Sequence, residues 1–246
     1  MLSLARQLGR VLLDFVLPPH CLVCRQYLEF AEELLCAKCW GQIRVQRPAR
    51  CPRCSSPEPG ERCANCASWE VERALVLGEY AGPLRQAIHL LKFQGHRHLG
   101  APLGRCLGQR PELAEALGEV DLLVPVPLFP ARQRERGYNQ SLGIAQGLAG
   151  VLGVPLCADR LQRQRSTRQQ ASLHAVERHH NLEGAFRVRG ALPAHTCIGL
   201  VDDVATTAST LAAGARALEA AGARRVWGVV LACPFVRQGS EIAALP

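Results

Sequence analysis

The sequence contains very little lysine, few aromatic residues and no long apolar run. Lys38 and Lys92 are its only lysines, so arginine carries nearly all of the positive charge. Aromatic residues make up 5% of the chain, which gives little support to a nucleic-acid site built from many stacked aromatic side chains. No stretch approaches the roughly 20 apolar residues that a membrane-spanning helix needs. No Ser-His-Asp or Cys-His arrangement stands out either, so catalysis by a nucleophilic triad has no candidate residues.

The composition is that of a folded globular protein. Of the 246 residues, 48% are apolar and 20% are charged, and the formal net charge is +8. The charge becomes smaller if eight cysteines bind two Zn²⁺ ions, because eight thiolates remove eight charges and the metal ions return four, which leaves +4. The net charge alone therefore does not predict a basic surface, which would have to come from local clusters of arginine.

Residues 1–19 are predicted to form an amphipathic helix. Arg6 and Arg10 precede a short apolar run at 11–17, a pattern that superficially resembles a signal peptide. The run contains Asp14 and ends in two prolines without a small-residue cleavage site, and proline stops a helix. Together with the paired cysteines described next, this predicts a cytoplasmic protein.

Eight of the twelve cysteines form four CxxC pairs. The pairs are Cys21 with Cys24, Cys36 with Cys39, Cys51 with Cys54, and Cys63 with Cys66. Two pairs complete a tetrahedral site of four thiolates for Zn²⁺, and four protein ligands leave no open position, so two structural sites are predicted. Sequential pairing would give two zinc ribbons in tandem over residues 20–69, whereas interleaved pairing would give a cross-brace. No CxxC pair follows a strand in a thioredoxin-like pattern, which argues against a redox role.

The rest of the chain alternates between predicted strands and helices. Apolar runs predict strands at 73–80, 122–126, 197–201 and 226–231. Helices are predicted from Gly82 to Lys92, from Asn139 or Ser141 to Leu152, and from Ser209 to Ala221. Residues 157–196 are polar, with one helical stretch around 173–182. This order predicts an α/β domain over residues 70–246, with a mostly parallel sheet and helices on both faces.

The segment 201–210 carries the strongest functional signal. An apolar strand ends in Asp202 and Asp203, and a loop of small and hydroxylated residues leads into a helix with an apolar stripe. The loop residues are Ala205, Thr206, Thr207, Ala208, Ser209 and Thr210. Their backbone N–H groups, their hydroxyls and the positive end of the helix dipole predict a phosphate site. The two carboxylates can accept hydrogen bonds from ribose hydroxyls or hold a hydrated Mg²⁺, so the ligand predicted is a sugar phosphate.

A simpler interpretation of this segment is a polar helix cap after a strand. Two adjacent carboxylates after a buried strand repel each other, which makes them an electrostatically wasteful choice for capping alone. The binding-site interpretation is therefore preferred.

The same segment resembles the signature of type I phosphoribosyltransferases, an apolar strand followed by D-D-x-x-T-T-G-x-T. Ala208 stands at the family's glycine position, and if that position requires positive φ, alanine strains the loop by roughly 1 kcal/mol or more. Three further blocks narrow the resemblance to the ComF family of competence and GntX-like proteins. They are Tyr80-x-Gly82-x-x-Arg85 with Leu91-Lys92-Phe93; Val124-Pro125-Val126-Pro127 with Arg132, Arg134 and Arg136-Gly137-Tyr138-Asn139-Gln140; and Thr167-x-x-Gln170 with Leu173, Arg178 and Asn181. The cysteine-rich segment resembles the family's double zinc ribbon, so the similarity spans nearly the whole chain.

The resemblance implies a fold, a ligand and partners. The fold would be a double zinc ribbon joined to a type I phosphoribosyltransferase-like domain. The ligand would be phosphoribosyl pyrophosphate or a related sugar phosphate with Mg²⁺, with Asp202 and Asp203 in the catalytic positions and with Lys92 and Arg136 on the pyrophosphate. The function would be the handling of single-stranded DNA during natural transformation, with single-stranded DNA and DNA-uptake proteins as partners. The alternative is a phosphoribosyltransferase that acts on an unidentified nucleobase.

Basic residues outside the pocket are candidates for contacts with a nucleic-acid backbone. They are Arg132 and Arg134 in the loop 128–140, and Arg50, Arg53 and Arg62 among the cysteine pairs. A solvated charge run is the alternative for Arg132 and Arg134. Thr167, Gln170, Arg178 and Asn181 would form part of a hood over the site or of a nucleic-acid groove, or else simple helix surface. The aromatic residues near basic ones, and so the candidates for stacking, are Phe93, Tyr138 and Phe186.

Overall fold

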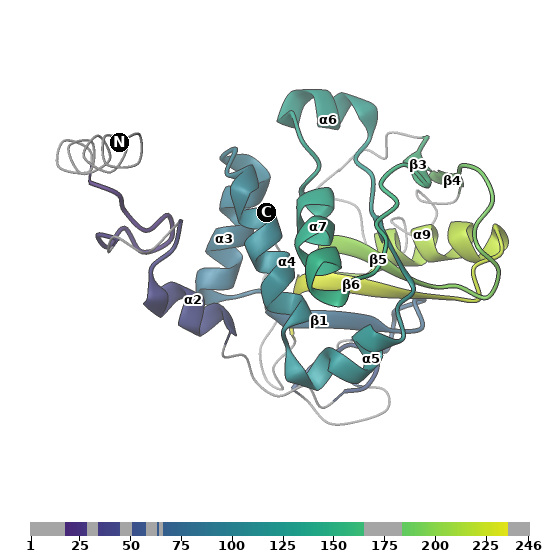
Figure 1. The fold of residues 1–246 in the computed structure, drawn as a ribbon, viewed down its shortest axis with the longest axis horizontal. Coiled ribbons are helices and arrows are strands. Elements are labelled where there is room, and N and C mark those ends of the chain that lie inside the picture. The colour runs from purple at the N-terminus through teal and green to yellow at the C-terminus, as the bar shows by residue number, and fades with distance from the viewer. Residues whose placement is uncertain are drawn as a thin grey trace, which may run out of the picture.

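The chain folds around a four-stranded sheet in which every neighbouring pair of strands is parallel (Figure 1). A computed structural model describes residues 18–28, 34–44, 51–57, 63, 66–164 and 184–235. In spatial order the strands are β1 (Ala74–Glu79), β6 (Arg225–Cys233), β5 (Cys197–Val204) and β2 (Leu122–Pro125). All four overlap the predicted apolar runs, which confirms the α/β fold with a parallel sheet.

Helices cover both faces of this sheet. They are α3 (Gly82–Phe93), α4 (Gly100–Gly108) and α7 (Gln140–Leu152) on one side, and α9 (Ser209–Ala220) on the other. Side chains of a strand alternate between faces, so Leu75 and Leu77 of β1 lie in one core with α3, α4 and α7. Ala74 and Val76 lie in a second core with α9. The sheet is therefore buried on both faces, as its continuous apolar runs predict.

Several elements differ from the sequence prediction. The segment 128–140, predicted as a loop, contains a short helix, α6 (Pro130–Arg136). Proline at its start and Gly137 in the left-handed conformation at its end bound it, but it buries no side chain and so has no apolar stripe to reveal it. Other elements not foreseen are η1 (Arg97–Leu99), α4, η2 (Pro111–Leu113) and α5 (Ala114–Gly118). Within the described ranges, no helix has the length and apolar character needed to cross a membrane.

A small antiparallel hairpin lies outside the main sheet. It consists of β3 (Leu161–Arg163) and β4 (Phe186–Val188), and β4 packs against α9. The predicted helix around 173–182, with the four polar residues between Thr167 and Asn181, falls outside the described residues. The predicted helix over 1–19 does so as well, apart from its two prolines, and the domain limits at 19 and 69 stay predictions.

The cysteine-rich segment packs against the sheet domain in two places. Cys21, Cys36 and Cys39, with the short helix α2 (Ala37–Arg44), join the core of α3, α4 and α7. Cys51, Cys54, Cys63 and Cys66 join the core of α9 on the opposite face of the sheet. The two halves of the segment thus belong to different cores.

Hydrogen bonds join the second half of this segment to the edge strand β1. The hydroxyl of Ser55 donates to the carbonyl of Ala74 at 3.4 Å and accepts from the amide of Val76 at 3.2 Å, and the amide of Ala74 donates to the carbonyl of Arg53 at 2.7 Å. These bonds use groups that the edge of a sheet otherwise exposes.

Helices α4 and α7 approach each other so closely that glycine is required at their contact. A Cβ atom at Gly104 would overlap the carbonyl oxygen of Ile144, and one at Gly147 would overlap the carbonyl oxygen of Ala101. The backbone of α7 is therefore held directly against that of α4.

We expect Gly104→Ala to lower the free energy of unfolding by about 2–3 kcal/mol, because the added methyl forces two packed helices apart. Gly150→Ala on the exposed side of α7 is the control, since a Cβ there meets no atom within 4 Å. That substitution should stabilise the protein by about 0.5–1 kcal/mol through helix propensity. Denaturant unfolding of both variants decides the matter, and equal effects at the two positions would contradict the close contact.

Candidate functional site

The loop between β5 and α9 presents backbone amides at the carboxyl edge of the sheet. β5 extends to Val204, so Asp202 and Asp203 lie inside the strand and not after it. The amide of Ala205 donates to the carbonyl of Ala232 at 3.0 Å, which removes it from the predicted set of phosphate donors. Helix α9 begins at Ser209, and the first amides of a helix have no partner within the helix. The backbone amides that could bind an anion therefore belong to residues 206–211.

Ala208 adopts the left-handed backbone conformation, with φ 54° and ψ 12°. The position at which the family has glycine therefore does require positive φ. Alanine carries a strain of roughly 1 kcal/mol there. Its side chain is buried in the core of α9, together with Leu211 and Val230. A buried methyl contributes about 0.8 kcal/mol, which offsets much of the strain and explains how alanine is accommodated.

The hydroxyls of the loop are partly engaged with each other. Thr207 Oγ1 and Ser209 Oγ lie 2.8 Å apart and share a hydrogen bond. Ser209 is buried, whereas Thr206 is exposed. Because a hydroxyl both donates and accepts, this pair can still offer one proton to an anion.

Asp203 is buried and forms an ion pair with Lys92 at the end of α3. Lys92 Nζ lies 2.8 Å from Asp203 Oδ1, and the Asp203 side chain is 4% exposed. Burial alone would lower the pKa of Lys92, but the charge and hydrogen bond of Asp203 outweigh it, so the pKa is raised and the ammonium stays charged. The other carboxylate oxygen, Asp203 Oδ2, is buried without a hydrogen-bond partner in the described part of the chain. Such an acceptor is costly unless something supplies a donor.

Asp202 is half-buried and is held by α7. Ser141 Oγ donates to Asp202 Oδ1 at 3.0 Å, and the backbone amide of Asp203 donates to the same oxygen at 2.9 Å. Burial, together with the charge of Asp203, raises the pKa of Asp202 to about 7, although Lys92 opposes this. Asp202 can thus take up a proton near neutral pH; together with Asp203 it forms what we call the acid pair. Sequence reasoning identified Ser141 as a possible helix cap but not as a partner of this carboxylate.

The segment 136–141 fixes the position of Ser141. Asn139 caps α7 by accepting from the amide of Ser141 at 3.0 Å, and its side-chain amide donates to the carbonyl of Val126 at 3.0 Å. The hydroxyl of Tyr138 donates to the carbonyl of Leu91, next to Lys92. The end of β2, the start of α7 and the end of α3 are therefore joined at the acid pair.

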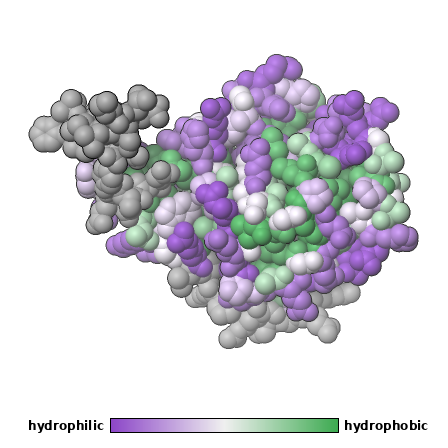
Figure 2. Space-filling model, in the orientation of Figure 1, coloured by the Kyte–Doolittle hydropathy of each residue, from purple (hydrophilic) through white to green (hydrophobic). Residues whose placement is uncertain are grey.

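Arginines surround this site on two sides. Arg136 donates to Gln140 Oε1 at 2.7 Å and lies over the ring of Phe93, while Arg134 is exposed on α6. Hydrophilic residues gather over α6 at the top of the molecule (Figure 2). From β3, Arg163 is close enough to Asp202 for the carboxylate to raise its pKa, although burial lowers that pKa more strongly. Sequence reasoning missed Arg163, because only the fold brings the hairpin to the acid pair.

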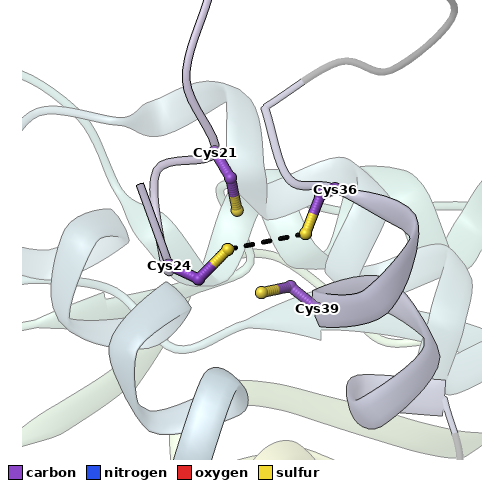
Figure 3. A group of neighbouring side chains, drawn as sticks. All are labelled: Cys21, Cys24, Cys36 and Cys39. Carbon is purple, nitrogen blue, oxygen red and sulfur yellow. Dashed lines mark hydrogen bonds between the residues drawn. The ribbon is translucent and has the colours of Figure 1, made fainter. Parts of the chain in front are cut away.

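The cysteine pairs form two clusters in sequential order. Cys21, Cys24, Cys36 and Cys39 make one cluster, and Cys51, Cys54, Cys63 and Cys66 make the other, with all sulfur atoms of a cluster within 4.8 Å of one another. Figure 3 shows the four sulfur atoms of the first cluster turned toward a common centre. Tetrahedral Zn–S bonds of 2.3 Å place sulfur atoms about 3.8 Å apart, and Cys24 Sγ and Cys36 Sγ lie 3.6 Å apart. Both clusters are thus compatible with zinc, and the interleaved alternative is wrong.

Arg53 has a structural role beside the second cluster. Its guanidinium donates to the carbonyls of Cys66 at 2.9 Å, Val71 at 3.0 Å and Glu72 at 3.3 Å, and also to that of Trp69. These carbonyls take four of the five N–H donors of the guanidinium, which favours a structural role over the predicted contact with a nucleic-acid backbone. Arg50 and Arg62 lie outside the described residues.

Comparison with known proteins assigns the chain to a family. Residues 12–70 match the family model of the double zinc ribbon domain. Over 219 residues the chain is 35% identical to DNA utilization protein YhgH of Salmonella typhi, an alignment that covers 85% of this chain and 94% of that protein. It is 32% identical over 225 residues to competence protein F of Haemophilus influenzae, covering 87% and 97%. A solved purine phosphoribosyltransferase from Pyrococcus horikoshii is 16% identical, with a TM-score of 0.32 over 55% of this chain and 87% of that one. The chain therefore belongs to the ComF family, as its motifs predicted.

Proposed function

We propose that the loop 205–210 and the acid pair bind a phosphoribosyl ligand, with phosphoribosyl pyrophosphate as the compound that the motif implies. The observation that carries the proposal is the left-handed conformation of Ala208, which is kept in spite of its strain and turns the chain into the start of α9. Strain of this kind persists where the surrounding structure requires it, often at ligand sites. The phosphate would be bound by the amides of residues 206–211 and by the hydroxyls of Thr206 and Thr207.

The two carboxylates of the acid pair would have different roles. Lys92 neutralises Asp203, so Lys92 can reach a diphosphate only by giving up this ion pair. We therefore assign the pyrophosphate contact mainly to Arg136 and give Lys92 the role of counter-charge. Asp202, half-buried and next to Ser141, would meet the ribose hydroxyls or a hydrated Mg²⁺ that arrives with the diphosphate.

We further propose that each cysteine cluster binds one Zn²⁺ ion with a structural role. Four thiolates complete the coordination of zinc and leave no position for a substrate. Because buried cysteines of each cluster belong to a core of the sheet domain, the metal would stabilise that domain as well as the ribbons. Paired thiols of this kind also favour the reducing environment of the cytoplasm.

The wider role we propose is the handling of single-stranded DNA during DNA uptake, together with other DNA-uptake proteins. Two relatives carry the names competence protein F and DNA utilization protein. Arg132 and Arg134 are exposed on α6. This helix leads directly into the segment 136–141, whose Ser141 contacts Asp202, and a DNA backbone could bind along it. A second candidate is phosphoribosyl transfer to a nucleobase, which is favoured by the raised pKa of Asp202 in a sugar-phosphate site.

For the metal sites, we expect about two Zn²⁺ per chain in protein purified without chelator. Cys66→Ser should reduce this to about one and lower Tm, because Cys66 is fully buried beside the sheet. Cys157→Ser is the control and should leave two, since Cys157 lies in neither cluster. Elemental analysis and thermal unfolding measure both effects. Metal content near zero, or disulfides in a reduced preparation, would refute the zinc sites.

For the phosphoribosyl site, we expect calorimetry to detect phosphoribosyl pyrophosphate binding in the presence of Mg²⁺. Asp202→Asn should weaken it about tenfold or more, because the amide keeps the size of the side chain but loses the charge. The effect on Tm should be small, whereas Asp203→Asn should destabilise the fold by leaving Lys92 buried without its partner. Glu115→Gln, on exposed α5 surface, is the charge-matched control. Absence of binding to the wild type would defeat the proposal.

For nucleic acid, we expect single-stranded oligonucleotides to bind with an affinity that falls steeply with salt, because phosphate contacts release counterions. Arg134→Ala should weaken all sequences similarly and reduce the slope of log K against log salt by about 0.7. Arg105→Ala, at an exposed site on α4, should change neither value. Fluorescence anisotropy over a range of salt concentrations provides the measurement. No binding at low salt with zinc fully loaded would exclude direct DNA handling.

A further inference from the structure

The three aromatic residues that lie near basic side chains differ in their exposure to solvent. Phe186 is buried, with 8% of its surface exposed. Tyr138 is half-buried, and its hydroxyl is used by the carbonyl of Leu91. Phe93 is 65% exposed, and among the described residues only Tyr27 is another large apolar side chain with comparable exposure. Phe93 alone of the three has a ring surface open to a ligand.

The surroundings of Phe93 are those of a ligand site and not of a core. The guanidinium carbon of Arg136 lies 5.6 Å from the ring centroid, and the His89 ring lies 5.0 Å away at a tilt of 46°. The preceding residue, Lys92, reaches back to Asp203. Phe93 therefore follows directly after the lysine of the ion pair and lies beside Arg136 of α6.

The exposure of Phe93 is not compensated by its neighbours. Full burial of a phenylalanine side chain is worth about 1.5–3 kcal/mol, whereas a cation–π contact at an exposed site returns only about 0.5–1 kcal/mol. The carbonyl of Leu91 is held by Tyr138, so the end of α3 is fixed and Phe93 is presented outward from a rigid position. A planar ligand that covers the ring would bury the apolar surface that the cation–π contact leaves exposed, and would gain the free energy of that burial.

We propose that Phe93 is a stacking platform for a nucleobase of single-stranded DNA, with Arg136 and Arg134 on the adjoining phosphates. This inference rests on the nucleic-acid role proposed above and names the part of the strand that the site recognises. Every nucleobase has a flat face that stacks on an aromatic ring, so this contact adds affinity without reading sequence. The arginine beside the ring explains why a base attached to a phosphate is preferred over an apolar partner.

The test compares two oligonucleotides of equal length, one with bases and one abasic throughout, in binding to the full chain. Both carry the same backbone charge, so arginine contacts act on both, whereas stacking acts only on the strand with bases. Phe93→Leu keeps apolar bulk but removes the aromatic face. It should weaken binding of the strand with bases about tenfold and leave the abasic strand unchanged. Arg134→Ala should weaken both strands to the same degree.

A second variant guards against an effect on folding. Phe93→Trp keeps an aromatic face, so it should retain at least wild-type affinity, and its fluorescence should be quenched by the strand with bases but not by the abasic strand. Wild-type protein that binds both strands equally, with Phe93→Leu unchanged, overturns the stacking platform while the phosphate contacts stand. Wild-type protein that binds neither strand refutes the nucleic-acid role itself, so the two failures are distinct.

Discussion

Two adjacent carboxylates can lie within a buried strand here because Lys92 neutralises one of them. The ion pair takes Asp203 into the interior beside the cores, leaving Asp202 as the carboxylate that faces the rim. Without the ammonium, both acids would have to be exposed or protonated, since their mutual repulsion is strong at low dielectric. The ion pair fixes the end of α3, where Tyr138 also holds the carbonyl of Leu91 and where Phe93 is exposed.

The cysteine-rich segment and the sheet domain form one structural unit in physical terms. Each cluster contributes its buried sulfur atoms to a different face of the same sheet. The second cluster lies in the core that also contains Ala205 and Ala208, so the loop of the proposed sugar-phosphate site and the second cysteine cluster share packing. Two motifs that lie far apart in the sequence thus share one core on the α9 side of the sheet.

Much of the fold could be predicted because its signals are local. The strands are continuous apolar runs, the helices begin at Gly82, after the cap Asn139 and at Ser209, and the cysteine pairs carry their own ligand spacing. The depth of Asp203 could not be predicted, because the charge that permits it is supplied by Lys92 from a distant helix. Likewise, Ser141 and Arg163 are ordinary polar residues in the sequence, and only the tertiary structure brings them to Asp202. Helix α6 was missed because it is polar all round, although Pro130 and Gly137 mark its ends.

The contact between Ser55 and β1 bears on how the protein can be divided. β1 is an outer strand of the sheet, and the Ser55 hydroxyl together with the carbonyl of Arg53 occupies polar groups on its free side. A fragment that starts after the cysteine clusters would leave the polar groups on this edge without their partners. Unprotected strand edges pair with those of other molecules, so such a fragment would tend to aggregate even with the loop between β5 and α9 intact. The second half of the cysteine-rich segment thus also blocks the addition of a strand from another molecule to β1.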